Sequence, residues 1–259
     1  MTGMGARTPA GRRRAWLGRK IRRWRRVAGE VRRGEGPRRL FARALVVVAG
    51  TVHRQVVVVA LDLSGALPEA TTDAPVLIRL LRPEDVEAYA RFREEPVEAR
   101  PGLGRLEKGD LCISAWLEEE IVSVGWISRE RGWVDEIGRA LELAPDEAYS
   151  YDTYTAERWR GRGIAGARAL WAAAHLREAG YRRLVGWIAP QNQPAFGPAR
   201  KAGYLRLGVA GFIRLGPWRR DFVQPAGGRR RWAVRAEPIR IERDFAVLSG
   251  SLPDRVQEL

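Results

Sequence analysis

The hydrophobic and polar positions of this chain follow patterns typical of alternating strands and helices. Short runs rich in Val, Ile and aromatic residues predict strands at residues 55–63, 76–81, 111–117, 121–128, 149–155 and 183–188, with one or two more at 204–216. Helix formers, together with start and stop signals such as Pro83, Gly180 and Gly203, predict helices at residues 82–93, 164–179 and 193–202. Residues 95–110 are expected to form a loop with a short helix, and residues 217–259 are not assigned.

The order of these elements predicts the fold class. A strand and a helix are followed by two or three antiparallel strands, and then by helix, strand, helix and strand. This order predicts an α/β (α+β) domain with a mixed, mostly antiparallel central sheet flanked by helices. The acidic run Glu118-Glu119-Glu120 fits the turn of a hairpin. We expect this domain to occupy residues 76–216, after an N-terminal arm at 1–75 that includes one strand and before a C-terminal extension at 217–259.

The positive charge of the chain is concentrated in the N-terminal arm. Residues 1–43 contain fourteen Arg and one Lys against two Glu, so they carry +13 of the formal net charge of +15. Apolar residues recur every three or four positions between Ala15 and Arg33, which predicts an amphipathic helix with an arginine-rich face, and residues 40–48 predict a second short helix. Residues 14–33 are compatible with an anionic membrane surface, with docking on the domain itself, or with nucleic acid, for which no motif is present.

Other features of the composition exclude several classes of site. The chain has one cysteine, Cys112, which we expect to be buried on a strand, and two histidines far apart in the sequence. No internal disulfide is possible, and no metal site is expected. Because no apolar run approaches the about 20 residues of a membrane-spanning helix, we expect a cytoplasmic protein, peripheral at the membrane if the arm binds lipid. We expect Trp116, Trp126 and Trp133 to fill the core rather than to line a cleft.

A glycine-rich turn joins the strand at 149–155 to the helix at 164–179. Gly161 and Gly163 permit positive φ and remove side chains where the backbone must approach a ligand. The first turn of the following helix has free N–H groups, and its dipole favours anions, so a diphosphate fits this position. Arg160 and Arg162 add positive charge beside it. A P-loop is excluded because no Gly-Lys-Ser/Thr follows, and the antiparallel strands before the turn argue against a dinucleotide-binding unit.

Two segments resemble the signatures of the GCN5-related N-acetyltransferase (GNAT) family. The pattern (Q/R)-x-x-G-x-(G/A) fits Arg160-x-x-Gly163-x-Ala165, and a second frame from Arg158 to Gly163 also fits. The second segment of the family, Asn-x-x-Ala/Ser followed by Lys-x-Gly-Phe, resembles Asn192 to Ala195 and Lys201 to Tyr204. The resemblance covers about residues 76–215 and implies the acyl-CoA N-acyltransferase fold.

The resemblance also implies a function and a set of binding residues. The implied reaction is transfer of an acetyl or other short acyl group from acetyl-CoA or another acyl-CoA to a primary amine, by direct attack in a ternary complex. The implied contacts to coenzyme A are backbone groups that pair with pantetheine, amides that hold the pyrophosphate with Arg160 beside them, and a pantetheine contact at the second signature. These residues are Thr153, Tyr154 and Thr155, then Gly161, Arg162, Gly163, Ile164 and Ala165, and finally Asn192.

Proton transfer requires further groups. Asp152 is the candidate general base because it lies on the strand that leads to the turn, and Glu157 is the second candidate. Many members of the family carry a tyrosine acid seven residues after the asparagine, where this chain has Ala199, so a neighbouring tyrosine or water would have to act instead. The tyrosines considered are Tyr149, Tyr151 and Tyr154. The alternative function is a non-catalytic acyl-CoA-binding sensor, or an adaptor that uses the basic arm. We expect residues 95–110, 130–147 and the C-terminal region to select the acceptor.

Overall fold

The computed structural model describes residues 52–95, 102–234, 237–245 and 257–258. The chain divides into a larger compact unit, residues 54–212 and 220–259, and a smaller one, residues 1–53 and 213–219. The described residues of the smaller unit are the start of β1 (Val52–Asp62) and the turn that joins β9 (Leu205–Leu215) to β10 (Trp218–Pro225). The helices predicted at 15–33 and 40–48 lie outside the described residues, so the alternatives for the basic arm stay predictions.

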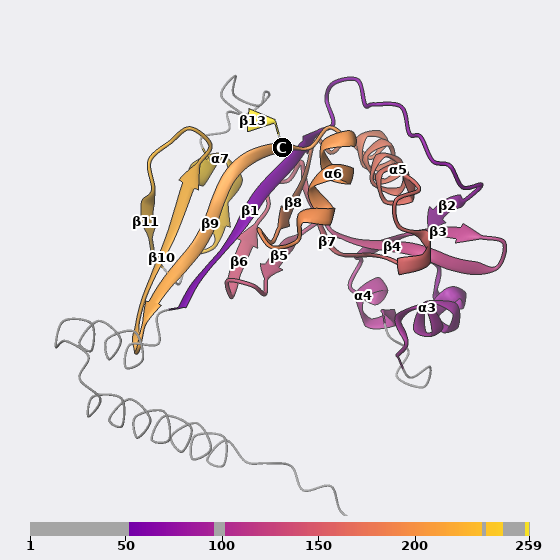
Figure 1. Cartoon of the computed structure of the whole chain (residues 1–259), viewed down its shortest axis with the longest axis horizontal. Coiled ribbons are helices and arrows are strands. Elements are labelled where there is room, and N and C mark those ends of the chain that lie inside the picture. The colour runs from indigo at the N-terminus through magenta and orange to yellow at the C-terminus, as the bar shows by residue number, and fades with distance from the viewer. Residues whose placement is uncertain (1–51, 96–101, 235–236, 246–256, 259) are drawn as a thin grey trace, which may run out of the picture. The chain divides into compact units, whose positions relative to one another are not determined.

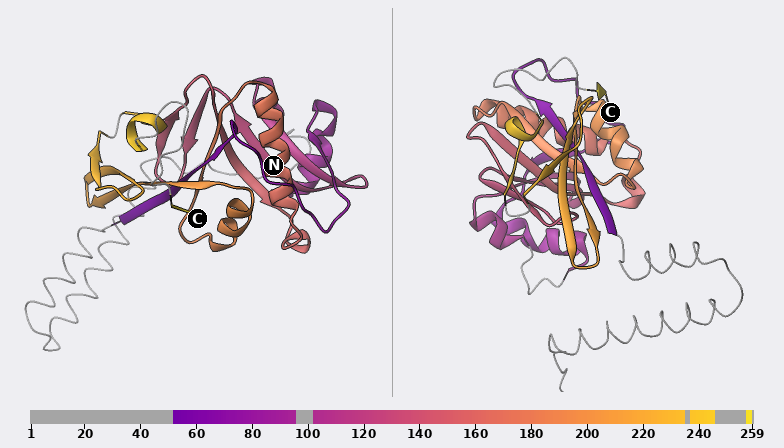
Figure 2. Two further views of the ribbon diagram at one scale, coloured as in Figure 1. Left: turned by 90° about the horizontal axis from the view of Figure 1, so that it is seen from above. Right: turned by 90° about the vertical axis from the view of Figure 1, so that its left-hand side faces the viewer.

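Ten strands form one mixed sheet. They follow the order β11-β10-β9-β1-β8-β7-β4-β3-β2, with β13 paired to β9, and Figure 2 shows the sheet of Figure 1 from two other sides. The pairings β1–β8, β2–β3, β3–β4, β4–β7, β10–β11 and β13–β9 are antiparallel, whereas β7 and β8 run parallel. This arrangement confirms the predicted mixed, mostly antiparallel sheet. The remaining strands are β2 (Leu77–Leu80), β3 (Leu111–Leu117), β4 (Glu120–Ser128), β7 (Glu147–Thr155), β8 (Arg183–Ile188), β11 (Arg231–Ala233) and β13 (Gln257–Glu258).

Helices cover both faces of the sheet. In Figure 1, α5 and α6 lie on one side of β4 and β7, and α3 and α4 lie on the other. The helical elements are the 3-10 helix η1 (Pro83–Asp85), α3 (Val86–Arg93), α4 (Leu103–Glu107), the 3-10 helix η3 (Glu157–Trp159), α5 (Ile164–Glu178), α6 (Gln193–Lys201) and α7 (Ile241–Phe245). No helix in the described part of the chain combines the length and apolar character needed to cross a bilayer.

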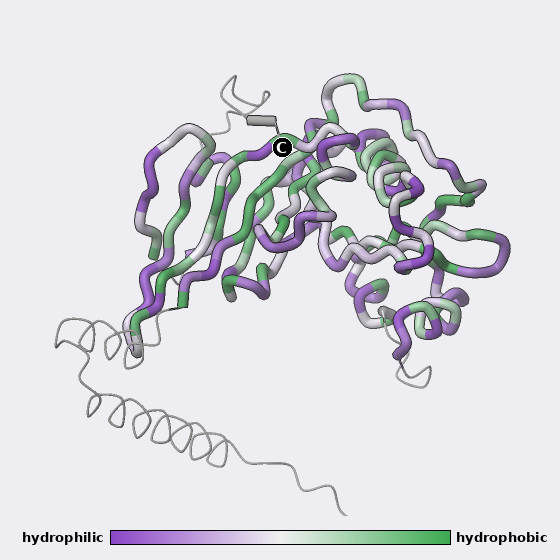
Figure 3. Tube along the Cα trace, viewed as in Figure 1, coloured by the Kyte–Doolittle hydropathy of each residue, from purple (hydrophilic) through white to green (hydrophobic). Residues whose placement is uncertain are grey.

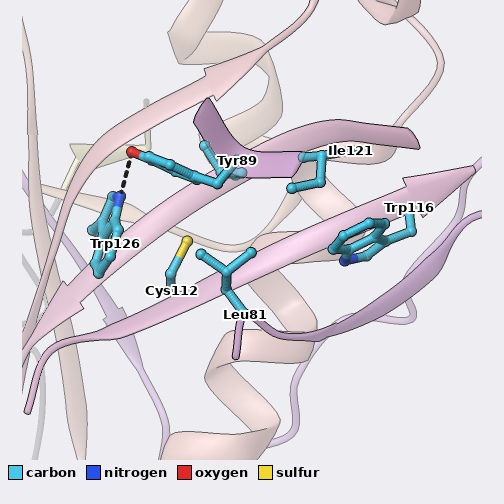
Figure 4. Packing of buried hydrophobic residues seen from close by; sticks show 7 residues of the cluster. Leu81, Tyr89, Cys112, Trp116, Ile121 and Trp126 are labelled. Atoms are coloured by element: carbon cyan, nitrogen blue, oxygen red, sulfur yellow. Dashed lines mark hydrogen bonds between the residues drawn. The ribbon is translucent and has the colours of Figure 1, made fainter. Parts of the chain in front are cut away.

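The two faces of the sheet have separate apolar cores. On the α3 side, Tyr89 packs edge-on against Trp126, and the Trp126 Nε1–H donates to the Tyr89 hydroxyl at 3.0 Å (Figure 4). Cys112 lies in the same cluster at 1% exposure, which confirms its predicted burial. On the α5 side, Ile164 packs against Ala74, Ala115 and Val122. The hydropathy colouring in Figure 3 shows apolar residues along the central strands, where β1 is buried over six consecutive residues.

The structure corrects several sequence predictions. Trp116 and Trp126 are buried as expected, but the prediction that Trp133 fills the core is wrong, because it is 56% exposed. It lies on β5 (Arg131–Val134), where the neighbouring residues Gly132 and Val134 are buried and Trp133 lies on the exposed face. β5 pairs with β6 (Arg139–Glu142) in a small second sheet that β12 (Ile239–Arg240) completes. By contrast, the single strand β9 agrees with the one or two strands predicted at 204–216. β1, predicted as a strand of the N-terminal arm, lies in the large sheet between β8 and β9.

The parallel strands β7 and β8 pair over only part of their length. Their register runs from Glu147–Arg183 to Tyr149–Val185 and then stops. Beyond that point β7 stays paired with β4 as far as Thr155, and β8 stays paired with β1 as far as Ile188. The two strands therefore separate after Tyr149, and no described strand pairs with the β8-facing edge of β7 from residue 150 to residue 155.

A buried ion pair lies at the closed end of this fork. The Arg183 guanidinium contacts the Glu147 carboxylate, and these two side chains are 10% and 1% exposed. The other Glu147 oxygen accepts a hydrogen bond from the Ala144 N–H at 3.0 Å. Because both charged groups are out of water, each depends on the other for compensation.

Replacing Glu147 with alanine leaves the Arg183 guanidinium buried without its carboxylate. We expect Glu147→Ala to lower the free energy of unfolding, measured by urea denaturation, by about 3–5 kcal/mol. Glu142→Ala is the matched control, because the Glu142–Arg240 pair is about half exposed, and its loss should cost at most about 1 kcal/mol. Equal losses in the two variants would contradict a special role for the pair at the fork.

Candidate functional site

A loop of free backbone amides connects β7 to α5. Gly161 and Gly163 adopt φ of 80° and 78°, the left-handed region that glycine occupies without penalty. Among the described residues, the amides of residues 161–166 donate no hydrogen bond, and the first bond of the turn is from Ala167 N–H to Gly163 O at 3.0 Å. These donors lie at the positive end of the helix α5 dipole, so the loop can accept an anionic group.

A segment before β2 holds this loop from behind. The Thr72 hydroxyl donates to the Arg162 carbonyl at 3.0 Å, and the Asp73 N–H donates to the same oxygen at 3.1 Å. Ala74 then packs against Ile164, the first residue of α5. We call residues 71–74 the strap. Its two hydrogen bonds to the Arg162 carbonyl fix the orientation of the 162–163 peptide, which carries the Gly163 N–H.

No local sequence pattern predicts the strap, which lies within the predicted N-terminal arm at 1–75. Its local signal is weak: the Thr72 hydroxyl accepts a hydrogen bond from the Ala74 N–H at 3.2 Å, which is a common turn. The contact with Arg162 spans 90 residues, and such a separation is not visible in local sequence patterns.

The two predicted arginines of the loop are positioned by neighbouring groups. Arg160 Nε donates to the Thr155 carbonyl at 3.0 Å, and its Nη1 pairs with Glu157 at 3.1 Å. Arg162 lies over the Trp159 ring, 4.8 Å from its centroid. Arg160 is therefore tied to the end of β7, and both side chains contribute positive charge next to the free amides.

β7 carries a bulge where its edge is free. The β4 register passes from Val124–Tyr154 to Trp126–Tyr151, so Asp152 and Thr153 have no partner on β4. Asp152 has φ of 45°, which is uncommon for a residue other than glycine. Such a bulge turns side chains and carbonyls out of the regular ladder. Of the carbonyls predicted to face pantetheine, that of Tyr154 accepts a hydrogen bond from the Ser123 hydroxyl at 3.1 Å.

The Asp152 carboxylate is bound by two arginines from helices that precede it in the chain. Arg93, at the end of α3, contacts Oδ1 at 3.2 Å, and Arg105, on α4, contacts Oδ2 at 2.7 Å. Arg105 is the more exposed of the two, at 42% of its side chain against 22%. No sequence pattern predicts a contact of either arginine with Asp152. Their contacts place Asp152 on the α3 and α4 side of the sheet, opposite α5.

Aromatic side chains surround the bulge on that same side. Tyr149 stacks on Trp187 with centroids 4.2 Å apart, and on Tyr151 at 5.4 Å. Burial raises the pKa of both tyrosines well above the ordinary value, and the Tyr151 hydroxyl donates to Asp110 at 2.7 Å. Tyr154 is 37% exposed, which makes it the accessible phenol among the three tyrosines considered.

The second predicted contact lies at the start of α6. Asn192 is exposed and is the N-cap residue of this helix, but its side chain makes no capping hydrogen bond. Its amide is thus available to a ligand. Ala199 lies within α6, at the position where many members of the family carry a tyrosine, so α6 presents no phenol there.

The comparisons with known proteins agree with this geometry at the level of the family. Residues 75–204, half of the chain, match the model of the acetyltransferase (GNAT) family. The comparison with curated proteins finds no match.

Several solved structures resemble the chain weakly. A Drosophila protein is 19% identical, with a TM-score of 0.44, over 69% of this chain and 55% of its own. A conserved protein of unknown function from Staphylococcus epidermidis is 13% identical, with a TM-score of 0.45, over 71% and 69%. A GNAT-family acetyltransferase from Colwellia psychrerythraea is 15% identical, with a TM-score of 0.46, over 64% and 57%. The chain thus spans just over half the length of the first and third of these proteins.

The two glycines of the loop give a matched test of the strap. A Cβ on Gly163 would lie 2.5 Å from the Thr71 carbonyl oxygen, whereas a Cβ on Gly161 would meet no atom within 4 Å. Both substitutions carry the cost of a left-handed conformation, about 1–2 kcal/mol. We expect Gly163→Ala to lower the free energy of unfolding by a further 1–3 kcal/mol or so relative to Gly161→Ala, in urea denaturation. Equal losses would mean that the strap does not press on the loop.

Proposed function

This chain belongs to the GNAT family of acetyltransferases, and on that premise we propose that it transfers an acyl group from coenzyme A to a primary amine. The row of free amides at residues 161–166, next to a strand with an unpaired edge, carries the proposal. A linear molecule with a diphosphate at one end and amide groups along its arm would satisfy both features at once.

The cradle and the strand edge fit the two halves of coenzyme A. The amides of Gly161 to Ala165 would hold the pyrophosphate, helped by the α5 dipole and by the charges of Arg160 and Arg162. The pantetheine arm would lie along the edge of Thr153, Tyr154 and Thr155, in the manner of an added strand. Asn192, on the other side of the fork, would contact the same arm.

The chemistry takes place at the bulge in β7. The acceptor amine attacks the thioester carbonyl carbon, the carbon–sulfur bond breaks, and the amine proton goes to Asp152, directly or through a water. Both Asp152 oxygens accept hydrogen bonds from guanidinium groups, so the arriving amine must displace one of them. Arg105 is the partner to displace, because it is the more exposed.

The departing thiolate gains from protonation. Tyr149 is buried, and the Tyr151 hydroxyl already donates a hydrogen bond to Asp110, so neither phenol is available. Tyr154 or a water remains for this step. If a Tyr154→Phe variant keeps its kcat, the role belongs to water.

A non-catalytic acyl-CoA sensor is the second candidate function, and the alanine at position 199 favours it. Calorimetry with coenzyme A, together with a thiol-release assay using acetyl-CoA and a panel of amines, separates the two. Binding with release supports the enzyme, and binding without release for any amine supports the sensor. Absence of binding would overturn both.

The amide cradle is tested by adding a negative charge at Gly166, the third residue of α5. This position has an ordinary φ and open space around its Cβ, so a side chain fits. Gly166→Glu should keep or raise the free energy of unfolding, because an acid in the first turn favours the helix. It should weaken coenzyme A binding about tenfold or more in calorimetry, since about 1.4 kcal/mol of repulsion suffices. Gly166→Gln, the neutral control, should bind within about threefold of the unaltered chain. Equal affinity of the two variants would contradict a phosphate site here.

The candidate bases are separated by two amide substitutions. If Asp152 accepts the proton, Asp152→Asn should lower kcat by about 10²- to 10⁴-fold while leaving the affinity for coenzyme A within about twofold, by calorimetry. Glu157→Gln should leave kcat nearly unchanged, because this side chain is 82% exposed and paired with Arg160. A large loss of kcat in Glu157→Gln with none in Asp152→Asn would identify Glu157 as the general base.

A further inference from the structure

A buried arginine lies beside the proposed site without a carboxylate to neutralise it. Arg168 is on the sheet-facing side of α5 and is 5% exposed, among apolar neighbours of the same helix face. Its Nε donates to the Ser123 hydroxyl on β4 at 3.1 Å. In the part of the chain that the structure describes, no ion pair to Arg168 is present.

The fold makes room for this guanidinium. A Cβ added at Gly125 on β4 would lie 1.8 Å from Arg168 Nη1, so only glycine permits the side chain to occupy its place. Gly125 lies opposite the bulge of β7, where the register skips Asp152 and Thr153. Arg168 therefore lies against the strand pair that carries the candidate catalytic residue, on the α5 side of the sheet.

The surroundings of Arg168 provide no negative charge. The side chains that act on it electrostatically are the thiol of Cys112 and the phenol of Tyr204. Burial raises the pKa of Cys112 to about 12 and raises that of Tyr204 as well, so both groups are neutral near neutral pH. Burying a cation without an anion lowers the stability of the folded protein. An anionic ligand beside Arg168 would offset this loss.

The location of Arg168 indicates where such a ligand would come from. The Ser123 hydroxyl that binds its Nε also contacts the Thr155 hydroxyl, at 2.8 Å, at the end of the free β7 edge. Tyr204, which acts on the same guanidinium, lies between α6 and β9. Through Ser123, Arg168 thus lies next to the β7 wall of the fork through which the acyl arm would enter.

We propose that Arg168 binds the distal carboxylate of an acyl group that ends in an acid, so that the preferred donors are dicarboxylic acyl-CoA thioesters such as succinyl-CoA or malonyl-CoA. This inference rests on the proposed acyl-CoA site and specifies its donor class. A guanidinium forms two parallel hydrogen bonds with a carboxylate, and an acetyl group offers it none.

The test compares affinities by calorimetry for succinyl-CoA and for coenzyme A on the full chain. The unaltered protein should bind succinyl-CoA between about tenfold and a hundredfold more tightly than coenzyme A, as expected for a hydrogen bond to a charged group. Arg168→Met should abolish this ratio, and Arg168→Lys should keep part of it. Arg177→Met removes an exposed arginine from the same helix and should leave the ratio unchanged.

A second variant covers the case in which Arg168→Met does not fold. Gly125→Ala keeps the positive charge but displaces the guanidinium, so it should also reduce the ratio. Equal affinities of the unaltered chain for the two ligands, or a ratio that survives both substitutions, would overturn the proposal and leave Arg168 as an anchor for Ser123 only.

Thiol release measured in parallel distinguishes this failure from that of the proposed function. If neither ligand binds, the acyl-CoA site itself is refuted. Preferential binding of succinyl-CoA without thiol release would uphold the donor class and refute the enzyme.

Discussion

The separation of β7 from β8 is the constraint on which the rest of the site depends. Parallel strands normally stay paired, because each unpaired N–H and C=O on a buried edge is costly. Here the pairing ends at Tyr149 and Val185, and each strand keeps its other neighbour. The fork is therefore held open from outside, by β4 on one side and β1 on the other. The β8-facing edge of β7 has no partner strand among the described residues beyond Tyr149, and an amide-bearing arm of a ligand could pair with it.

Charged groups within the sheet are compensated in two different ways around this fork. At its closed end, Glu147 and Arg183 neutralise each other, so that end is complete without a ligand. At its open end, Asp152 is shared by two arginines, and Arg168 has no acid partner among the described residues. Arg168 is therefore the buried charge near the open end for which the described residues offer no acid, and it is the charge that an anionic group of an acyl-CoA would neutralise.

The parts of the molecule that were predictable are those encoded locally. The valine-rich run of β1, the glycines at 161 and 163 and the stop at Gly180 each act over a few residues, so their elements appear where the pattern places them. The short strands β5 and β6 form a local hairpin that no run of apolar residues announces, and β12 becomes a strand only by pairing with β6, which is distant in the sequence. For the same reason Arg93 and Arg105 could not be linked to Asp152: the contacts span 59 and 47 residues.

The strap involves both a local sequence signal and a long-range contact. Gly163 needs its positive φ to open the loop, which the sequence indicates, but the absence of a side chain there also lets the Thr71 carbonyl approach. One glycine thus satisfies a local and a long-range requirement, and Arg162 O receives its two hydrogen bonds only if both are met. Since that carbonyl belongs to the peptide that presents the Gly163 amide, the segment before β2 controls how the anion site is presented. The segment before β2, which lies in the predicted N-terminal arm, therefore contacts the loop proposed to hold the pyrophosphate, and substitutions in it should alter that loop even though 90 residues separate the two.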